Sequence, residues 1–517
     1  MNALAVLYGG GLTEAAYEPV FSGKSALALA LEQAAAFPDT RKVLLLTQST
    51  PIRHAGGLQG VELVVAGQWT KQRVLNTLAR EAEGFDCTYF AWADCPFLDT
   101  ELAKVLAERH LQYAAEYSYA DGWPYGLAPE LLAPGVGGIL AKILGDADGP
   151  VERDILFSVI QKDINAFDIE TVLSPVDLRG HRLSLTADSK RNLLLLTRFM
   201  EAGFSKAQDV EVLIREKPEL LRTLPNFFHI QAAGPCPQRC ILCPYPGFQG
   251  AEELTQRTDF LDSERFEALL GRIVAFAGDG VIDLSLWGEL SLHPEKLELI
   301  RRVLARPELS LIIETSGLGW KPDELERLAV EAQEALPRRN GMAPVSWILA
   351  LDAQDPARYR EIRGNGYAEA LATTQTLTRL FPQDAYVQAV RVKGFEDDIE
   401  QFYRFWKEAG ARIIIQKYDH FCGVLPALGA ADLSPVKRQP CWHLLRDMVI
   451  LLNGTVPCCR EDLAALTGTP GKGLWGNVFS DPLETIWSRG GILYEEQCIP
   501  AYTGICAGCD EYYTYNF

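Results

Sequence analysis

The stretch FFHIQAAGPCPQRCILCPYPG, residues 227–247, joins an apolar run to three closely spaced cysteines. The run FFHIQAA is short and apolar, which is typical of a strand buried on both faces of a parallel sheet. Cys236, Cys240 and Cys243 follow it with the spacing C-x3-C-x2-C. The sequence therefore predicts a buried strand that ends in a loop carrying three thiols.

Five further apolar runs follow this loop and alternate with segments of helical periodicity. They are VIDLSLW, LSLIIET, VSWILALD, AYVQAVRV and ARIIIQKY. Six βα units in succession predict a parallel, incomplete six-stranded barrel, and such folds place their chemistry at the C-terminal ends of the strands. Besides the cysteine loop, the residues expected at this mouth are Trp287, Gly288, Glu289, Thr315, Ser316, Gly317, Asp352, Gln388, Arg391, Lys417, Asp419 and His420.

The first 150 residues have their own alternation of strand and helix patterns. ALAVLY, KVLLLTQ, VELVVAG and CTYFAWA predict buried parallel strands, with helical stretches between them, so an open α/β sheet is expected. The predicted division is a sheet domain at 1–150, a connecting region with one strand at 151–225, the partial barrel at 226–421 and a small cysteine-rich domain at 422–517.

Composition limits the function classes. Of the 517 residues, 48% are hydrophobic and 23% charged, which is ordinary for a globular protein. The formal net charge of -19 argues against nonspecific binding of nucleic acid or of anionic membranes. No apolar run approaches the ~18 residues that span a bilayer, and the N-terminus MNALAVLYGGG lacks signal-peptide features, so we expect a cytoplasmic protein.

In the cytoplasm the twelve cysteines are expected to be thiols or metal ligands and not disulfides. Three thiolates leave three alternatives open. They are an iron–sulfur cluster with one iron that lacks a protein ligand, a zinc site with an open position, and free thiols.

The three-cysteine loop after the first barrel strand resembles the radical SAM superfamily. That resemblance implies a [4Fe–4S] cluster whose open iron binds S-adenosylmethionine (SAM) through its amino and carboxylate groups. SLWGE, 285–289, matches the family's Gly-Gly-Glu segment, with Trp287 in place of the first glycine and Gly288 retained. The resemblance implies that Glu289 meets the SAM amino group, with Ser316, Gln388 and Arg391 as further cofactor-binding candidates.

The C-terminal region resembles the SPASM/twitch extension of radical SAM enzymes. CWHLLRDMVILLNGTVPCCRED, GNVFSDPLETIWSRG and the closing C-x2-C match its parts in order. The resemblance implies a second, auxiliary [4Fe–4S] cluster on Cys441, Cys458, Cys506 and Cys509, with Cys459 as the alternative to Cys458. A four-cysteine zinc site is the other interpretation. Cys422 and Asp352 are candidate catalytic residues.

The N-terminal third resembles nucleotidyltransferases, since AVLYGGGLTEAAYEPVFSGK parallels their glycine loop and WADCPFLD their metal-binding aspartate, here Asp94. No lysine or arginine lies between Gly9 and Pro19 to hold a triphosphate, so we expect a degenerate domain. The order of the three domains resembles the spiro-SPASM family.

The predicted function is a radical SAM enzyme of oxidoreductase type that abstracts hydrogen from a sugar- or nucleotide-linked molecule or a peptide. A flavodoxin or ferredoxin is the expected reductant. The alternatives are a non-catalytic zinc-binding nucleotide-sensing adaptor and a bifunctional enzyme that is both a nucleotidyltransferase and a radical SAM enzyme.

Overall fold

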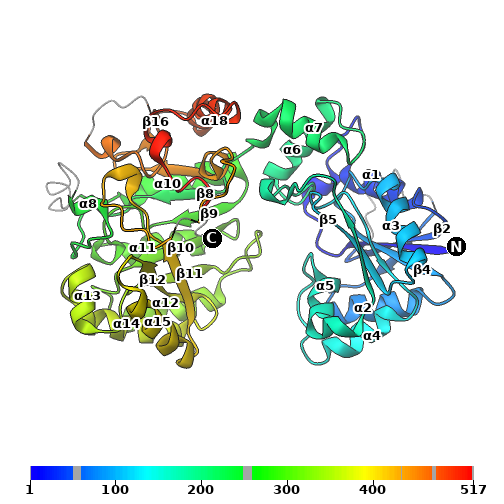
Figure 1. Ribbon diagram of the computed structural model, residues 1–517, viewed down its shortest axis with the longest axis horizontal. Helices are drawn as coiled ribbons and strands as arrows, with labels where there is room; N and C mark the ends of the chain where they lie inside the picture. The colour runs from blue at the N-terminus through cyan, green and yellow to red at the C-terminus, as the bar shows by residue number, and fades with distance from the viewer. Residues whose placement is uncertain (1, 50–59, 248–258, 432, 468–472, 515–517) are drawn as a thin grey trace. The chain divides into compact units, whose positions relative to one another are not determined.

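The computed structural model describes residues 2–49, 60–247, 259–431, 433–467 and 473–514. The chain forms two compact units, Met1–Thr223 and Leu224–Phe517 (Figure 1). Among the described residues, none of the helices combines the length and the apolar character that crossing a bilayer requires.

The first unit is built on a mixed sheet with the strand order β3-β2-β1-β4-β6-β5-β7. The four strands predicted in residues 1–150 pair in parallel, which confirms the open α/β sheet. The short strand β6 runs antiparallel to both of its neighbours, and β7 lies in the segment that was expected to connect the domains. The strands are β1 (Ala3–Gly9), β2 (Thr40–Thr47), β3 (Val61–Val65), β4 (Cys87–Trp92), β5 (Tyr117–Asp121), β6 (Glu130–Leu132) and β7 (Ile169–Leu173). The α-helices are α1 (Ala26–Ala35), α2 (Lys71–Glu81), α3 (Thr100–Gln112), α4 (Val136–Leu144), α5 (Ile155–Ile160), α6 (Lys190–Glu201) and α7 (Asp209–Glu216).

The second unit contains the predicted partial barrel as an all-parallel sheet with the order β13-β12-β11-β10-β9-β8-β14. The six predicted strands lie side by side in chain order. A seventh strand, β14, comes from the cysteine-rich tail and pairs in parallel with β8. The strands are β8 (Phe227–Ile230), β9 (Gly280–Asp283), β10 (Leu309–Thr315), β11 (Val345–Ala350), β12 (Ala385–Arg391), β13 (Arg412–Lys417) and β14 (Asp447–Ile450).

Helices follow the strands of this sheet, as the βα pattern predicts. They are α8 (Pro244–Gly247), α10 (Ser263–Ala277), α11 (Lys296–Leu304), α12 (Pro322–Glu334), α13 (Pro356–Arg363), α14 (Tyr367–Leu380) and α15 (Glu396–Glu408). The tail adds α16 (Trp442–Arg446), an antiparallel pair of β15 (Thr455–Pro457) and β16 (Leu474–Asn477), α17 (Leu483–Arg489) and α18 (Gly491–Cys498).

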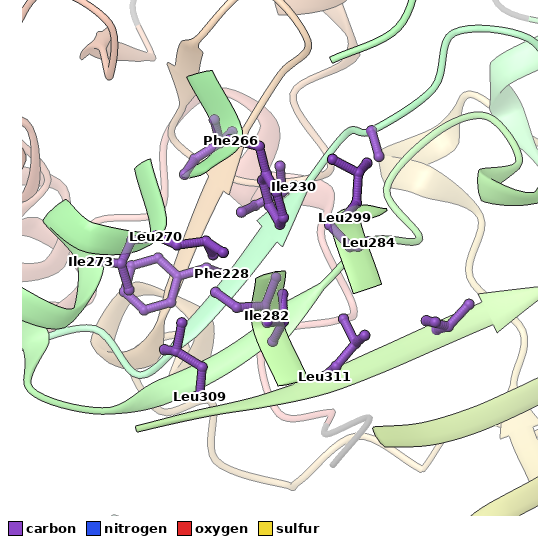
Figure 2. Close-up of a cluster of buried hydrophobic side chains, with 14 of the residues drawn as sticks. Phe228, Ile230, Phe266, Leu270, Ile273, Ile282, Leu284, Leu299, Leu309 and Leu311 are labelled. Atoms are coloured by element: carbon purple, nitrogen blue, oxygen red, sulfur yellow. The ribbon is translucent and has the colours of Figure 1, made fainter. Parts of the chain in front are cut away.

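Side chains alternate between the two faces of each strand, so that one set packs in the hydrophobic core and the other faces the site. Phe228 and Ile230 of β8 pack with Ile282 of β9 and Phe266 of α10 in the main hydrophobic cluster (Figure 2). Because successive side chains of a strand point to opposite faces, Phe227 and His229 face the inside of the barrel. Burying a large apolar side chain contributes about 1.5–3 kcal/mol, so the covering helices fix the register and thereby the residues of the inner face.

Candidate active site

Residues at and beyond the carboxyl ends of the barrel strands line one cavity of about 230 Å³. Because the strands are parallel, their carboxyl ends meet at one edge of the sheet. The cavity brings together most of the site residues predicted from the sequence. Its polar lining includes Cys236, Cys240, Cys243, Gly288, Glu289, Thr315, Ser316, Asp352, Gln388, Lys417 and Asp419.

The three-cysteine loop contributes all of its thiols to this cavity. Gln238, between the first two cysteines, is buried and donates from Nε2 to the Tyr359 hydroxyl at 2.7 Å, which ties the loop to α13. Burial raises the pKa of Cys236 to about 12, and it also raises the pKa values of Cys240 and Cys243. The metal-free thiols are therefore protonated at neutral pH, and binding of a metal must release their protons.

Glu289 is buried at the wall of the cavity, and its carboxylate accepts hydrogen bonds on both oxygens. Oε1 accepts from the Thr315 hydroxyl at 2.7 Å and from the Ser291 amide at 3.2 Å. Oε2 accepts from the Ser316 amide at 2.8 Å and from the Ser316 hydroxyl at 2.7 Å. The two predicted cofactor-binding residues Glu289 and Ser316 are thus one hydrogen-bonded unit that joins the ends of β9 and β10.

Gly288 and Trp287 shape the turn before Glu289. Gly288 has φ +95°, and a Cβ there would lie 2.1 Å from the Ala233 carbonyl oxygen. Trp287 has φ +43°, in the left-handed region that favours glycine, and stacks on Tyr245 with ring centroids 5.9 Å apart. Both residues of this turn therefore have the positive φ that glycine adopts most readily, although the first position carries tryptophan.

Asp352 pairs with an arginine that the sequence analysis missed. Its Oδ2 accepts from Arg363 at 2.5 Å and its Oδ1 accepts from the Val390 amide at 2.8 Å. Arg363 ends α13, a helix whose N-cap Asp355 accepts from the backbone N–H of Arg358. Because Arg363 comes from a helix and not from a strand end, the strand pattern carried no signal for it.

Gln388 lines the cavity and donates to Glu314 Oε1 at 2.9 Å. Burial raises the pKa of Glu314, a residue of β10 that the sequence analysis did not name among the site residues. Arg391, by contrast, is exposed and is not among the described residues that line the cavity. The cationic side chains that do line it are Arg363, Lys417 and Arg460.

A second cavity in the tail is lined by five cysteines, which are Cys422, Cys441, Cys459, Cys506 and Cys509. The sequence left open whether Cys458 or its neighbour Cys459 is a ligand of the auxiliary site. Cys459 lines this cavity. Cys458 is not among its described lining residues, and its sulfur lies 3.7 Å from Asp462 Oδ2. The structure also places Cys422 in this cavity, a residue that the sequence analysis gave as a candidate catalytic residue.

Several ion pairs involve residues that line the first cavity and lie close in sequence to residues that line the second. Arg460, next to Cys459, contacts Asp419 at 3.3 Å and Glu511 at 3.5 Å. Lys417 contacts Asp510 at 2.8 Å and also pairs with Glu511. The carboxylates of Asp419, Asp510 and Glu511 are close enough to hold a metal ion, but each of them is already paired with Arg460 or Lys417.

In the first unit, Asp94 is held by an arginine. Arg153 donates to both Asp94 oxygens, at 2.7 and 2.6 Å, and also contacts Asp188 at 2.9 Å. The Arg153 guanidinium lies 4.3 Å from the centre of the Trp92 ring. The carboxylate that resembles a metal ligand is therefore neutralised by a side chain of the chain itself.

No family model matches the sequence. Among solved structures, SuiB of Streptococcus suis bound to the precursor peptide SuiA is 13% identical with a TM-score of 0.40, over 74% of this chain and 88% of SuiB. A cytidylyltransferase from Leptospira borgpetersenii is 17% identical with a TM-score of 0.36, over 42% of this chain and 95% of that enzyme. Similarities this distant assign no activity.

Two proteins of Treponema pallidum (strain Nichols), both described as uncharacterized, are similar in sequence. One is 40% identical over 75 residues, which are 14% of this chain and 34% of the relative. The other is 36% identical over 369 residues, which are 70% of this chain and 98% of the relative. The chain therefore belongs to the same family as this second Treponema pallidum protein.

Proposed function

We propose that this protein is a radical SAM enzyme with one auxiliary [4Fe–4S] cluster in its tail. The observation that carries the proposal is the convergence of three thiols, from one loop after the first barrel strand, on a cavity that also contains Glu289, Ser316 and Asp352. Among the described residues that line this cavity, no fourth cysteine is present. Three thiolates and an open iron are what a SAM-binding cluster requires.

The donor set fits such a cluster. Thiolates are the usual protein ligands of iron–sulfur clusters, and the three cysteines share one loop and one cavity. When the cluster and SAM are bound and one electron is supplied, the C5′–S bond of SAM breaks to give methionine and a 5′-deoxyadenosyl radical. The chain's own part is to hold the cofactor and to exclude water. Arg363 is a cation of the same lining, and its Nε donates to Gln238 Oε1 of the cysteine loop at 3.1 Å.

The polar lining favours a polar substrate. Glu314 and Gln388 line the cavity as a hydrogen-bonded pair, and Lys417 and Arg460 are cations in the same lining. Groups of this kind suit a hydroxylated or charged molecule, such as a sugar- or nucleotide-linked compound, or a polar segment of a peptide. A small electron-transfer protein of the flavodoxin or ferredoxin class is the partner we propose as reductant.

Metal content after anaerobic reconstitution tests the proposal of two clusters. We expect about eight irons per chain, because each [4Fe–4S] cluster holds four. The double variant Cys506→Ala/Cys509→Ala should retain about four irons. Cys87→Ala, which changes a buried cysteine of β4 in the first unit, is the matched control and should retain all of them. Four irons with one zinc in the unaltered protein would contradict the auxiliary cluster and favour a zinc site in the tail.

A further inference from the structure

The cysteine cavity of the tail holds one thiol more than a four-iron cluster needs. Four of its cysteines, Cys441, Cys459, Cys506 and Cys509, are the candidate ligands of the auxiliary cluster. The fifth, Cys422, lies just after β13. A [4Fe–4S] cluster usually takes four cysteine ligands, so one thiol of this cavity is left for another role.

Cys422 is held against the closing pair of cysteines by its local structure. It lies in the 3₁₀ turn Phe421–Gly423, which packs against the 3₁₀ turn Gly504–Gly508 that carries Cys506. The side chains of Cys422 and Cys509 are hydrogen-bonded to each other. Cys422 therefore lies beside Cys509, which is one of the four candidate cluster ligands.

Hydrogen bonds to the backbone amides on both sides of Cys422 fix the turn that carries it. Asp419 Oδ1 accepts from the Phe421 amide at 2.7 Å, and His420 Nδ1 accepts from the Gly423 amide at 2.8 Å. Cys422 itself has φ +52°, a conformation that costs a non-glycine residue energy and persists where surrounding contacts impose it. These bonds hold the thiol in place before any cluster is bound.

We propose that Cys422 is a non-ligating positioning residue whose S–H donates a hydrogen bond to the sulfur of Cys509 and thereby raises the reduction potential of the auxiliary cluster. This proposal rests on the auxiliary cluster of the proposed function. A coordinated Cys509 has lost its proton and can only accept, so the donor must be Cys422. A hydrogen bond to a cluster sulfur stabilises the reduced state, which carries more negative charge, and so moves the potential upward.

Cys87 offers a matched control. It is a buried cysteine of β4 in the first unit. A general effect of losing a thiol would appear in both variants, whereas the proposal concerns Cys422 alone.

The test is a redox titration followed by electron paramagnetic resonance, on full-length protein that also carries Cys236→Ala, Cys240→Ala and Cys243→Ala. These changes leave the auxiliary cluster as the only expected signal. In this background we expect C422A, C422S and C87A each to retain about four irons. The potential should fall in C422A by up to about 59 mV, the one-electron equivalent of a tenfold change. It should recover toward the starting value in C422S, whose hydroxyl is still a donor, and stay unchanged in C87A.

Three results would overturn the proposal. Loss of the four irons in both C422A and C422S would make Cys422 a ligand, and an unchanged potential in C422A would make it a bystander. Absence of iron from the tail of the parent protein would remove the cluster itself. None of these results bears on SAM cleavage at the barrel loop, which is measured separately, so failure here is distinguishable from failure of the radical SAM assignment.

Discussion

At the scale of single residues, Gly288 is where backbone geometry constrains the site most tightly. Its φ of +95° and the 2.1 Å that would separate an added Cβ from the Ala233 carbonyl oxygen leave no room for a side chain. We expect Gly288→Ala to lower the melting temperature and to weaken SAM binding, because the turn must move and carries the neighbouring Glu289 with it. Thermal unfolding and titration with SAM measure the two effects.

The control for this substitution is Gly271→Ala. Gly271 is exposed in the interior of α10, with nothing within 4 Å of an added Cβ. Alanine there should stabilise the helix by about 0.5–1 kcal/mol and leave SAM binding unchanged. Equal behaviour of the two variants would contradict the role given to Gly288.

At the scale of elements, β14 is joined to β8 by a buried charge cluster centred on Asp447. His229 Nε2 lies 3.4 Å from Asp447 Oδ2, and His443 Nδ1 lies 2.5 Å from the same oxygen. Arg446 Nε donates to Asp447 Oδ1 at 2.5 Å. Burial alone would raise the pKa of Asp447, but the charges of His443 and Arg446 and the histidine hydrogen bonds hold it well below its usual range. For His229, burial acts to lower the pKa, yet its bonds to Asp283 and Asp447 raise it.

These shifts predict how stability depends on pH. The contribution of Asp447 is present above its unfolded pKa of about 3.9 and is lost as the pH falls further. The contribution of His229 is complete below its unfolded pKa of about 6.5 and is lost as the pH rises through the higher folded value. We expect Asp447→Asn to reduce the free energy of unfolding at pH 7 by about 3–5 kcal/mol, since it leaves buried cations without their partner. Denaturant unfolding measures this, with Asp397→Asn, an exposed change on α15, as the control. A loss below about 1 kcal/mol for Asp447→Asn would contradict the account of this cluster.

The elements that the sequence predicted are those whose patterns are long and local. Buried runs such as LSLIIET become β10, and the residues after them reach the cavity as expected. The strand β14 was missed because DMVI is only four residues long and its partner β8 lies more than two hundred residues earlier in the chain. Arg391 shows the limit of counting from strand ends. It ends β12 yet is exposed, because a shift of one residue along a strand reverses the face.

At the scale of the whole molecule, the two units differ in the chemistry they retain. In the first unit Arg153 occupies both oxygens of Asp94, and the segment from Gly9 to Pro19 has no lysine or arginine. Nucleotidyl transfer needs a metal-held triphosphate and positive charge where pyrophosphate develops. We therefore expect no pyrophosphate release from the common nucleoside triphosphates with magnesium. Turnover that disappears in Asp94→Ala would show instead a working transferase and a bifunctional enzyme.

The second unit carries the central claim, and formation of 5′-deoxyadenosine tests it most directly. Anaerobically reconstituted full-length protein is incubated with SAM and a strong one-electron reductant, and the nucleoside is quantified by chromatography. The account predicts reductive cleavage by the unaltered protein and none by the variant Cys236→Ala/Cys240→Ala/Cys243→Ala, which should still hold about four irons in its tail. Continued formation of 5′-deoxyadenosine by the triple variant, or none by the iron-loaded unaltered protein, would contradict it.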